Sequence, residues 1–321
     1  MPRVTIVVPA YNAEEHIIQC LDSVVTQTLD DIEVLLINDG STDSTGDIFD
    51  EYARRYSFVR VVHQENSGIF VTRSVALSLA TGEYVGWVDA DDWVAPTMFE
   101  TLYKAAVTNE SDLVYCNYSY FPKGVRSKTK WYKEYHGVKN VSYVERNSQF
   151  WNKLISRELL LREEIHELLP MCFEEAMIFV LLAARNPISI DSELYQYRVG
   201  HSSMSANYRN VAYYCGFIDA AQRLYTIATD RCLDQYWCDY FYFRKIYYCL
   251  MALIVAANAG ERNEFRALKD KMKNEMPRYR KNQHFLKLLK EIYGCPIALV
   301  IGYVVPFKYS LTRMMCKIAF R

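Results

Sequence analysis

The sequence predicts an α/β fold: a mostly parallel sheet flanked by helices, followed by a largely helical C-terminal region. Over residues 1–120, short apolar runs rich in Val and Ile alternate with stretches whose apolar residues recur at helical spacing. From about Tyr208 the pattern is helical and rich in Tyr, Trp and Cys. With 321 residues, 51% of them hydrophobic and 23% charged, the chain can form one large domain or two ordinary ones.

The first part of the chain supplies the expected elements in alternation. Strands are expected at 4–8, 32–37, 59–62, 84–88 and 113–118, and Pro9 is expected to end the first of them. Helices are expected at 13–27, 44–56, 68–80 and 96–108, with Gly82 as the C-terminal glycine of the third. Residues 123–139 suggest a loop or hairpin. From Trp151 the chain is expected to be largely helical, including one long helical stretch at 208–257.

Composition excludes several classes of protein. The 37 Lys and Arg balance the 38 Asp and Glu, so a generally basic nucleic-acid-binding protein is disfavoured and no nucleic-acid partner is expected. None of the nine cysteines forms a C-x-x-C pair, which argues against a zinc ribbon or a disulfide framework and for reduced thiols in the cytoplasm. No uninterrupted apolar stretch reaches the ~18 residues expected of a transmembrane helix.

The C-terminal end is basic. From Glu261 onward there are 14 Lys and Arg against 5 Asp and Glu. An apolar segment at 297–307 is followed by Lys308, Arg313, Lys317 and Arg321. This amphipathic tail has two interpretations: peripheral contact with the inner face of a membrane, or a helix packed on the catalytic domain.

Polar residues follow the apolar strands where a parallel sheet places its ligands. Pro9, Tyr11 and Asn12 stand at the end of the first strand and Asp39 at the end of the second. The fourth strand leads into Asp89-Ala-Asp-Asp92. The chain has no G-x-G-x-x-G and no G-x-x-x-x-G-K-[ST]. A diphosphate would then need a divalent cation held by Asp-x-Asp. The alternative is that Asp91 or Asp92 caps the helix near Pro96.

These motifs resemble the family 2 glycosyltransferases with the GT-A fold. The resemblance covers about the first 120 residues in order and continues more weakly to about Ser205. It is carried by Pro9-Ala-Tyr-Asn12, Asn38-Asp-Gly-Ser-Thr-Asp43, Arg73, Ala80-Thr-Gly-Glu-Tyr84 and Val88-Asp-Ala-Asp-Asp-Trp93, then by Trp151-Asn-Lys-Leu154, Phe173 to Phe179 and Leu194-Tyr-Gln-Tyr-Arg198. It implies an inverting transferase that uses a nucleotide-diphosphate sugar, expected to be a UDP-sugar, and Mn²⁺ or Mg²⁺.

The resemblance also divides the chain. Residues 1–205 correspond to a GT-A catalytic domain with a nucleotide half at about 1–120 and an acceptor half at about 121–205. Residues 206–321 form the helical region with its basic tail. The acceptor is expected to be a glycan or a lipid-linked glycan.

Roles on the donor side follow residue by residue from the resemblance. Tyr11 corresponds to the aromatic side chain that stacks on the base, and Asp39 to the carboxylate that accepts a hydrogen bond from the base. Asp91 corresponds to the direct metal ligand, and His201 could complete the metal shell. The remaining donor-side residues implied by the resemblance are Pro9, Asn12 and Arg73 near the nucleotide and Asp89 near the ribose and metal. Arg198 and His201 follow a strand-like segment, and this position, rather than the resemblance, suggests that they face the diphosphate.

The acceptor side and the catalytic base are less sharply defined. Trp151 and Lys153 resemble residues that line the acceptor side. Family members carry a Glu-Asp pair before an apolar helix, where this chain has Phe173-Glu-Glu-Ala-Met177. One alignment makes Glu175 the general base and leaves Glu174 as its neighbour. The other places Ala176 at the position of the base. Both glutamates could also be ordinary residues at a helix N-terminus.

Two other functions stay open at this point. A chain that lacks the base would bind a sugar nucleotide without transferring the sugar. A sugar-1-phosphate nucleotidyltransferase also uses an α/β sheet and acidic metal ligands. That class normally needs a glycine-rich loop after the first strand, and Pro9-Ala-Tyr-Asn12 is not such a loop.

Overall fold

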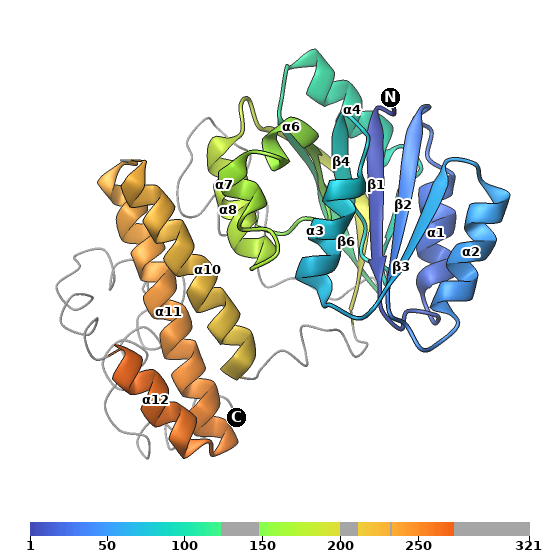
Figure 1. Cartoon of the computed structure of the whole chain (residues 1–321). Helices are drawn as coiled ribbons and strands as arrows, with labels where there is room; N and C mark the ends of the chain where they lie inside the picture. Colours follow the sequence, from blue (N-terminus) through green and yellow to red (C-terminus); the bar gives the residue numbers. More distant parts are fainter. Residues whose placement is uncertain (123–147, 200–210, 232, 273–321) are drawn as a thin grey trace. The chain divides into compact units, whose positions relative to one another are not determined.

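The computed structural model of the chain describes residues 1–122, 148–199, 211–231 and 233–272. The chain divides into two compact units, Met1–His201 and Ser202–Arg321. The first unit carries the sheet and the second is helical (Figure 1). Each unit is described by itself below.

An eight-stranded sheet organises the first unit, in the order β3-β2-β1-β4-β7-β6-β8-β5. Strands β1 to β4 are mutually parallel, β7 is antiparallel to β4 and β6, and β8 is parallel to β6. Strand β5 is antiparallel to β8. All strands except β5 and β7 therefore run in one direction, so their carboxyl ends meet at one edge. The strands are β1 (Val4–Ala10), β2 (Ile32–Asp39), β3 (Val59–Gln64), β4 (Tyr84–Trp87), β5 (Trp93–Val94), β6 (Leu113–Phe121), β7 (Lys153–Ser156) and β8 (Ile188–Arg198).

Helices cover both faces of the parallel part of this sheet. Every residue of β1 is buried, as expected for a β-branched strand that is covered on both sides. Residues of α1, α2 and α4 pack on one face with Val4, Ile6 and Val8, and α3 packs on β1 and β2 from the other face (Figure 1). The helices are α1 (Ile17–Val25), α2 (Thr45–Arg55), α3 (Ile69–Leu79), α4 (Met98–Thr108), α6 (Arg157–Leu160), α7 (Glu163–His166) and α8 (Phe173–Ala183).

The expected α/β class is confirmed, but three local expectations are wrong. Strand β1 continues through Pro9 to Ala10, where it pairs with β2. Because β4 pairs with β1 only as far as Val7, the N–H that Pro9 lacks is not needed for a hydrogen bond to β4. The region after Trp151 contains strands β7 and β8 besides short helices. Gly82 does not cap α3; a Cβ there would lie 2.5 Å from the backbone nitrogen of Thr5, so this glycine permits a close approach to β1.

The second unit contains α10 (Val211–Asp230), α11 (Gln235–Ala259) and α12 (Arg262–Met272). The single helical stretch expected at 208–257 is thus two helices. Asp234 begins α11 by accepting a hydrogen bond from the Tyr236 amide at 2.8 Å, and Gly260, at a φ of 84°, ends it.

Helix α11 bears on the expectation about membranes. Its length and composition would allow it to cross a membrane, although 78% of its apolar window is buried inside the structure. The search of the sequence for an uninterrupted apolar stretch did not find α11, because Asp239, Arg244 and Lys245 interrupt its apolar residues. The amphipathic tail at 297–321 lies outside the described residues.

Candidate functional site

The candidate site lies at the carboxyl edge of the parallel strands. Asp39 is the last residue of β2, and Arg198 is the last residue of β8. The turn from Asp89 to Asp92 follows β4 and leads into β5. The sheet therefore brings the predicted carboxylates and one predicted arginine to the same edge, although they are up to 159 positions apart in the chain.

Asp39 is buried and its carboxylate holds the loop that precedes α3. Its Oδ1 accepts hydrogen bonds from the Ser67 amide (2.9 Å) and Gln64 Nε2 (2.8 Å), and its Oδ2 accepts from the Gly68 amide (2.9 Å). Burial by itself raises the pKa of Asp39, but these hydrogen bonds outweigh it and hold the pKa below its usual value. Gly68 has a φ of 83°, which suits glycine at this sharp entry into the helix.

The loop after β1 is fastened to the loop after β2. Asn12, at a φ of 49°, accepts a hydrogen bond from the Thr42 amide at 2.8 Å, and its own amide donates to Ser41 Oγ at 3.0 Å. Pro9 is buried within β1, whereas Tyr11 is 50% exposed. An exposed aromatic ring next to the carboxyl edge is available to stack on a flat ligand.

Arg73 of α3 forms an ion pair with Asp89. One guanidinium nitrogen of Arg73 donates to Asp89 Oδ1 across 2.7 Å, and the two side chains are 9% and 26% exposed. A largely buried, charge-assisted hydrogen bond of this kind fixes both side chains. Two residues that were predicted for the same nucleotide are thus in direct contact.

The acidic turn itself is fastened by residues of β8. The Arg198 guanidinium donates from Nε to the Asp91 carbonyl oxygen at 2.8 Å, and the Arg198 amide donates to Asp92 Oδ1 at 2.7 Å. The same guanidinium lies 4.9 Å from the centre of the Trp93 ring. Helix α4 begins after Thr97, which is its N-cap, so the alternative in which Asp91 or Asp92 caps this helix is wrong.

Sequence reasoning overlooked Tyr195. Its hydroxyl accepts a hydrogen bond from the Asp89 amide at 3.1 Å and donates to Asp92 Oδ2 at 2.8 Å. The signal in the sequence was the set of β-branched and aromatic residues within 188–198, which is typical of a strand but does not by itself place Tyr195 beside the acidic turn.

The donor atoms at this turn suit a hard divalent cation. Asp89 and Asp91 supply carboxylate oxygens, and Mg²⁺-like ions are commonly held by one or two carboxylates together with substrate phosphates. Within the described residues, no group of three or more His, Cys, Asp or Glu side chains could hold a metal on its own. The remaining ligands would then come from the diphosphate and water. His201 lies outside the described residues.

On the acceptor side, Trp151 and Lys153 differ in their surroundings. The Trp151 ring is half-buried and stacks on Tyr197 at 5.2 Å between ring centres. Lys153 has no exposed surface; its Nζ donates to Asn152 Oδ1 at 2.7 Å, and burial lowers its pKa to about 7. In this structure the Lys153 side chain does not reach the protein surface.

The candidates for the catalytic base lie at the start of α8. Glu175 and Ala176 are both fully buried. The side chain of Glu174 is outside the part of the chain that the structure describes. A general base must come within hydrogen-bond reach of the acceptor hydroxyl. Glu175 can therefore act only if the acceptor site opens onto the start of α8.

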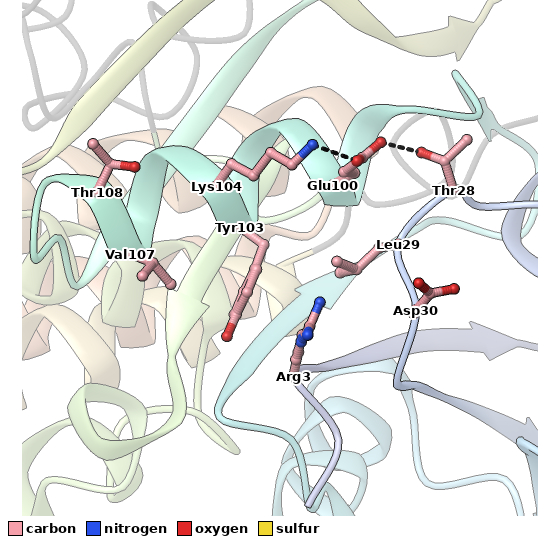
Figure 2. Close-up of a pocket in the computed structure, with 9 residues that line it drawn as sticks. All are labelled: Arg3, Thr28, Leu29, Asp30, Glu100, Tyr103, Lys104, Val107 and Thr108. Carbon is pink, nitrogen blue, oxygen red and sulfur yellow. Dashed lines mark hydrogen bonds and ion pairs between the residues drawn. The ribbon is translucent and has the colours of Figure 1, made fainter.

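Two cavities lie at the opposite edge of the sheet. The one in Figure 2, of about 220 Å³, is lined by Arg3, Asp30 and Tyr103 among others, which precede β1 and β2 or belong to α4. A second cavity, of about 780 Å³, is lined by Glu83, Asp112 and Arg185 near the amino ends of β4 and β6. Neither contains a residue of the acidic turn, so neither is the site described above.

Comparisons with known proteins agree with this geometry. Residues 5–172 match the family described as glycosyl transferase family 2. EpsJ of Bacillus subtilis, an uncharacterized glycosyltransferase, is 34% identical over 224 residues, in an alignment that covers 64% of this chain. The aligned part spans 63% of the length of EpsJ.

Solved structures share the fold at low identity. S. aureus TarS (residues 1–349) in complex with UDP-GlcNAc has a TM-score of 0.61 and 18% identity, covering 86% of this chain and 92% of that one. The mannosyltransferase PcManGT from Pyrobaculum calidifontis, in complex with GDP-Man and Mn²⁺, has a TM-score of 0.51 and 17% identity. That comparison covers 100% of this chain and 88% of PcManGT.

Proposed function

The chain belongs to glycosyltransferase family 2 and has the GT-A fold, and from that premise we propose that it transfers a sugar from a UDP-sugar to a hydroxyl of a glycan or lipid-linked glycan. The transfer would invert the anomeric configuration and serve polysaccharide biosynthesis. The observation that supports this proposal most is the acidic turn 89–92 at the carboxyl edge of the sheet. Arg73 forms an ion pair with the Asp89 carboxylate, and Arg198 donates a hydrogen bond to the Asp91 carbonyl oxygen.

The proposed reaction is a direct displacement at the anomeric carbon of the donor sugar. The acceptor oxygen forms a bond to the anomeric carbon while the bond from that carbon to the diphosphate oxygen breaks, and the acceptor proton passes to a carboxylate. A divalent cation, Mn²⁺ or Mg²⁺, bound by Asp91 and Asp89 would neutralise charge on the leaving diphosphate. Asp39 and Tyr11 would bind the base, with Pro9 and Asn12 shaping the same loop.

The choice of a uridine nucleotide rests on likeness to a UDP-GlcNAc complex, and the choice of cation on likeness to a Mn²⁺ complex. We propose Glu175 as the general base, and Trp151 as an acceptor-side residue. We propose a cytoplasmic location because the nine cysteines are odd in number and no two of them form a C-x-x-C pair.

The proposal is tested by thermal stabilisation with a panel of nucleotide sugars, with and without Mn²⁺. We expect one UDP-sugar to raise the melting temperature only when Mn²⁺ is present. Asp91→Asn should abolish that shift, whereas Asp30→Asn, at an exposed position on the opposite edge, should retain it. A shift that survives in Asp91→Asn, or stabilisation by no nucleotide sugar, would contradict the proposal.

A second function has a specific observation in its favour. The two candidate base positions with described side chains, Glu175 and Ala176, show no exposed surface. A chain without an accessible base would bind a UDP-sugar with Mn²⁺ and transfer nothing. Release of UDP in the presence of acceptor glycans distinguishes this binding protein from a transferase.

A further inference from the structure

Several hydrogen bonds hold the backbone of the acidic turn, and three of them come from Tyr195, Asp92 and Arg198. The Asp89 amide donates to the Tyr195 hydroxyl at 3.1 Å, and the Asp89 carbonyl oxygen accepts from the Asp92 amide at 3.0 Å. The Asp91 carbonyl oxygen accepts from Arg198 Nε at 2.8 Å. None of these three contacts involves the carboxylate of Asp89 or Asp91, so the turn is shaped independently of those carboxylates.

Asp92 plays a different part from the other two aspartates. It is 1% exposed, and its two oxygens accept from the Tyr195 hydroxyl at 2.8 Å and from the Arg198 amide at 2.7 Å. Burying a carboxylate is costly unless its oxygens are hydrogen-bonded. Both donors come from β8, a strand that begins almost 100 residues later in the chain, so Asp92 attaches the turn to the far part of the sheet.

Tyr195 connects Asp89 and Asp92, the first and last residues of the acidic turn. Its hydroxyl accepts from the Asp89 amide, so its single proton is directed to Asp92 Oδ2. Tyr195 has no exposed surface and its ring packs on Trp151 at 4.5 Å between centres. Packing of the buried Tyr195 ring therefore fixes the position of its hydroxyl relative to the acidic turn.

We propose that Tyr195 and Asp92 are positioning residues, which set the separation and direction of the Asp89 and Asp91 carboxylates for a divalent cation bound with a nucleoside diphosphate. This inference rests on the proposed function, since it concerns the same cation. Neither residue is proposed to touch the cation or the nucleotide. Their effect passes through the backbone of the turn.

The chain offers a matched control in Tyr197. It lies two residues farther along β8, on the same aromatic surface, and its ring stacks on Trp151. Among the described residues, its hydroxyl has no hydrogen bond to the acidic turn. Tyr195→Phe and Tyr197→Phe therefore remove the same atom from the same strand, and only the first should affect the turn.

The test measures Mn²⁺ binding at saturating UDP by electron paramagnetic resonance of the free ion. We expect Tyr195→Phe to weaken Mn²⁺ binding roughly tenfold, because the hydrogen bonds that the Tyr195 hydroxyl makes to the Asp89 amide and to Asp92 are both lost. Asp92→Asn should have an effect of at least this size, and Tyr197→Phe should match the wild type. Binding of UDP without metal should be equal in all of them.

Hydrogen exchange supplies a readout that needs neither metal nor activity. In Tyr195→Phe the Asp89 amide loses its acceptor, so a peptide covering 88–93 should exchange faster, while peptides from β1 and β2 stay unchanged. Equal Mn²⁺ affinity and equal exchange in Tyr195→Phe and Tyr197→Phe would overturn the positioning role alone. A wild-type chain that binds no Mn²⁺ with UDP would overturn the proposed function as well, which separates the two failures.

Discussion

Arg73 of α3 and Asp89 of the turn after β4 are joined by an ion pair of 2.7 Å, in which the arginine side chain is 9% exposed. The pair joins α3, whose preceding loop is held by Asp39, to the acidic turn, which is proposed to bind the metal. In such a setting each charge is the main compensation for burying the other.

Arg73→Met should therefore destabilise the protein by about 1–3 kcal/mol, because it leaves the Asp89 carboxylate without its charged partner. It should also weaken UDP binding, since Asp89 is then free to turn away. Urea denaturation and calorimetric titration with UDP measure the two effects. Arg55→Met is the control: its ion pair with Glu51 is exposed and worth less than about 1 kcal/mol. Equal losses in both variants would contradict a special role for Arg73.

Asp39→Asn tests the carboxylate that holds the loop before α3. Because hydrogen bonds lower the pKa of Asp39 in the folded protein, its stabilising effect is complete above the unfolded pKa of about 4. The effect is lost as the pH falls through the lower folded value. We expect the variant to be less stable by about 1.5–3 kcal/mol at pH 7.

The pH dependence separates this effect from a simple packing defect. The difference in unfolding free energy between wild type and Asp39→Asn should shrink as the pH falls below about 4. UDP binding should also weaken roughly ten- to a hundred-fold, with pyrophosphate binding unaffected, if Asp39 accepts from the base. A stability difference that is constant with pH would rule out an ionised Asp39 as the cause.

Lys153→Met tests a lysine that is buried without a carboxylate partner among its described contacts. Burial lowers its pKa to about 7, so between about pH 7 and pH 10 the unfolded chain holds a proton that the folded chain has lost. In this window the wild type should gain stability as the pH rises, and the variant should lack this gain. Thermal melts between pH 6 and pH 10 measure it. Lys104→Met, at a side chain that is 71% exposed, should show the wild-type slope.

Glu175→Gln and Ala176→Asp test the catalytic base with opposite expected outcomes. If Glu175 is the base, Glu175→Gln should reduce transfer by ~10²–10⁴-fold without changing donor binding. If Ala176 occupies the base position, the wild type should be nearly inactive and Ala176→Asp should raise transfer by a similar factor. Because Ala176 is fully buried, the melting temperature of that variant has to be measured beside its activity.

One result would contradict both assignments. If the wild type is active and neither substitution alters the rate, the base is Glu174 or a residue elsewhere. The assay uses one matched donor and acceptor for all three proteins.

Local patterns in the sequence were enough to predict the α/β class, the order of the first strands and helices, and the set of residues at the strand ends. The reason is that β-branched runs and helical periodicity are short-range signals, and parallel strands place their carboxyl ends at one edge whatever their register. The sequence by itself therefore predicts that Asp39, Asp89 and Asp91 lie at the same edge of the sheet.

Tertiary structure alone decided what those residues contact. The partners of Asp92 are Tyr195 and Arg198, more than 100 positions away. The sequence indicated only a strand-like segment before Arg198 and did not indicate that this strand, β8, contacts the acidic turn. The burial of Lys153 likewise depends on β7 lying between β4 and β6. Such pairings are set by packing over the whole sheet, because the local pattern of a strand does not determine which strands lie beside it.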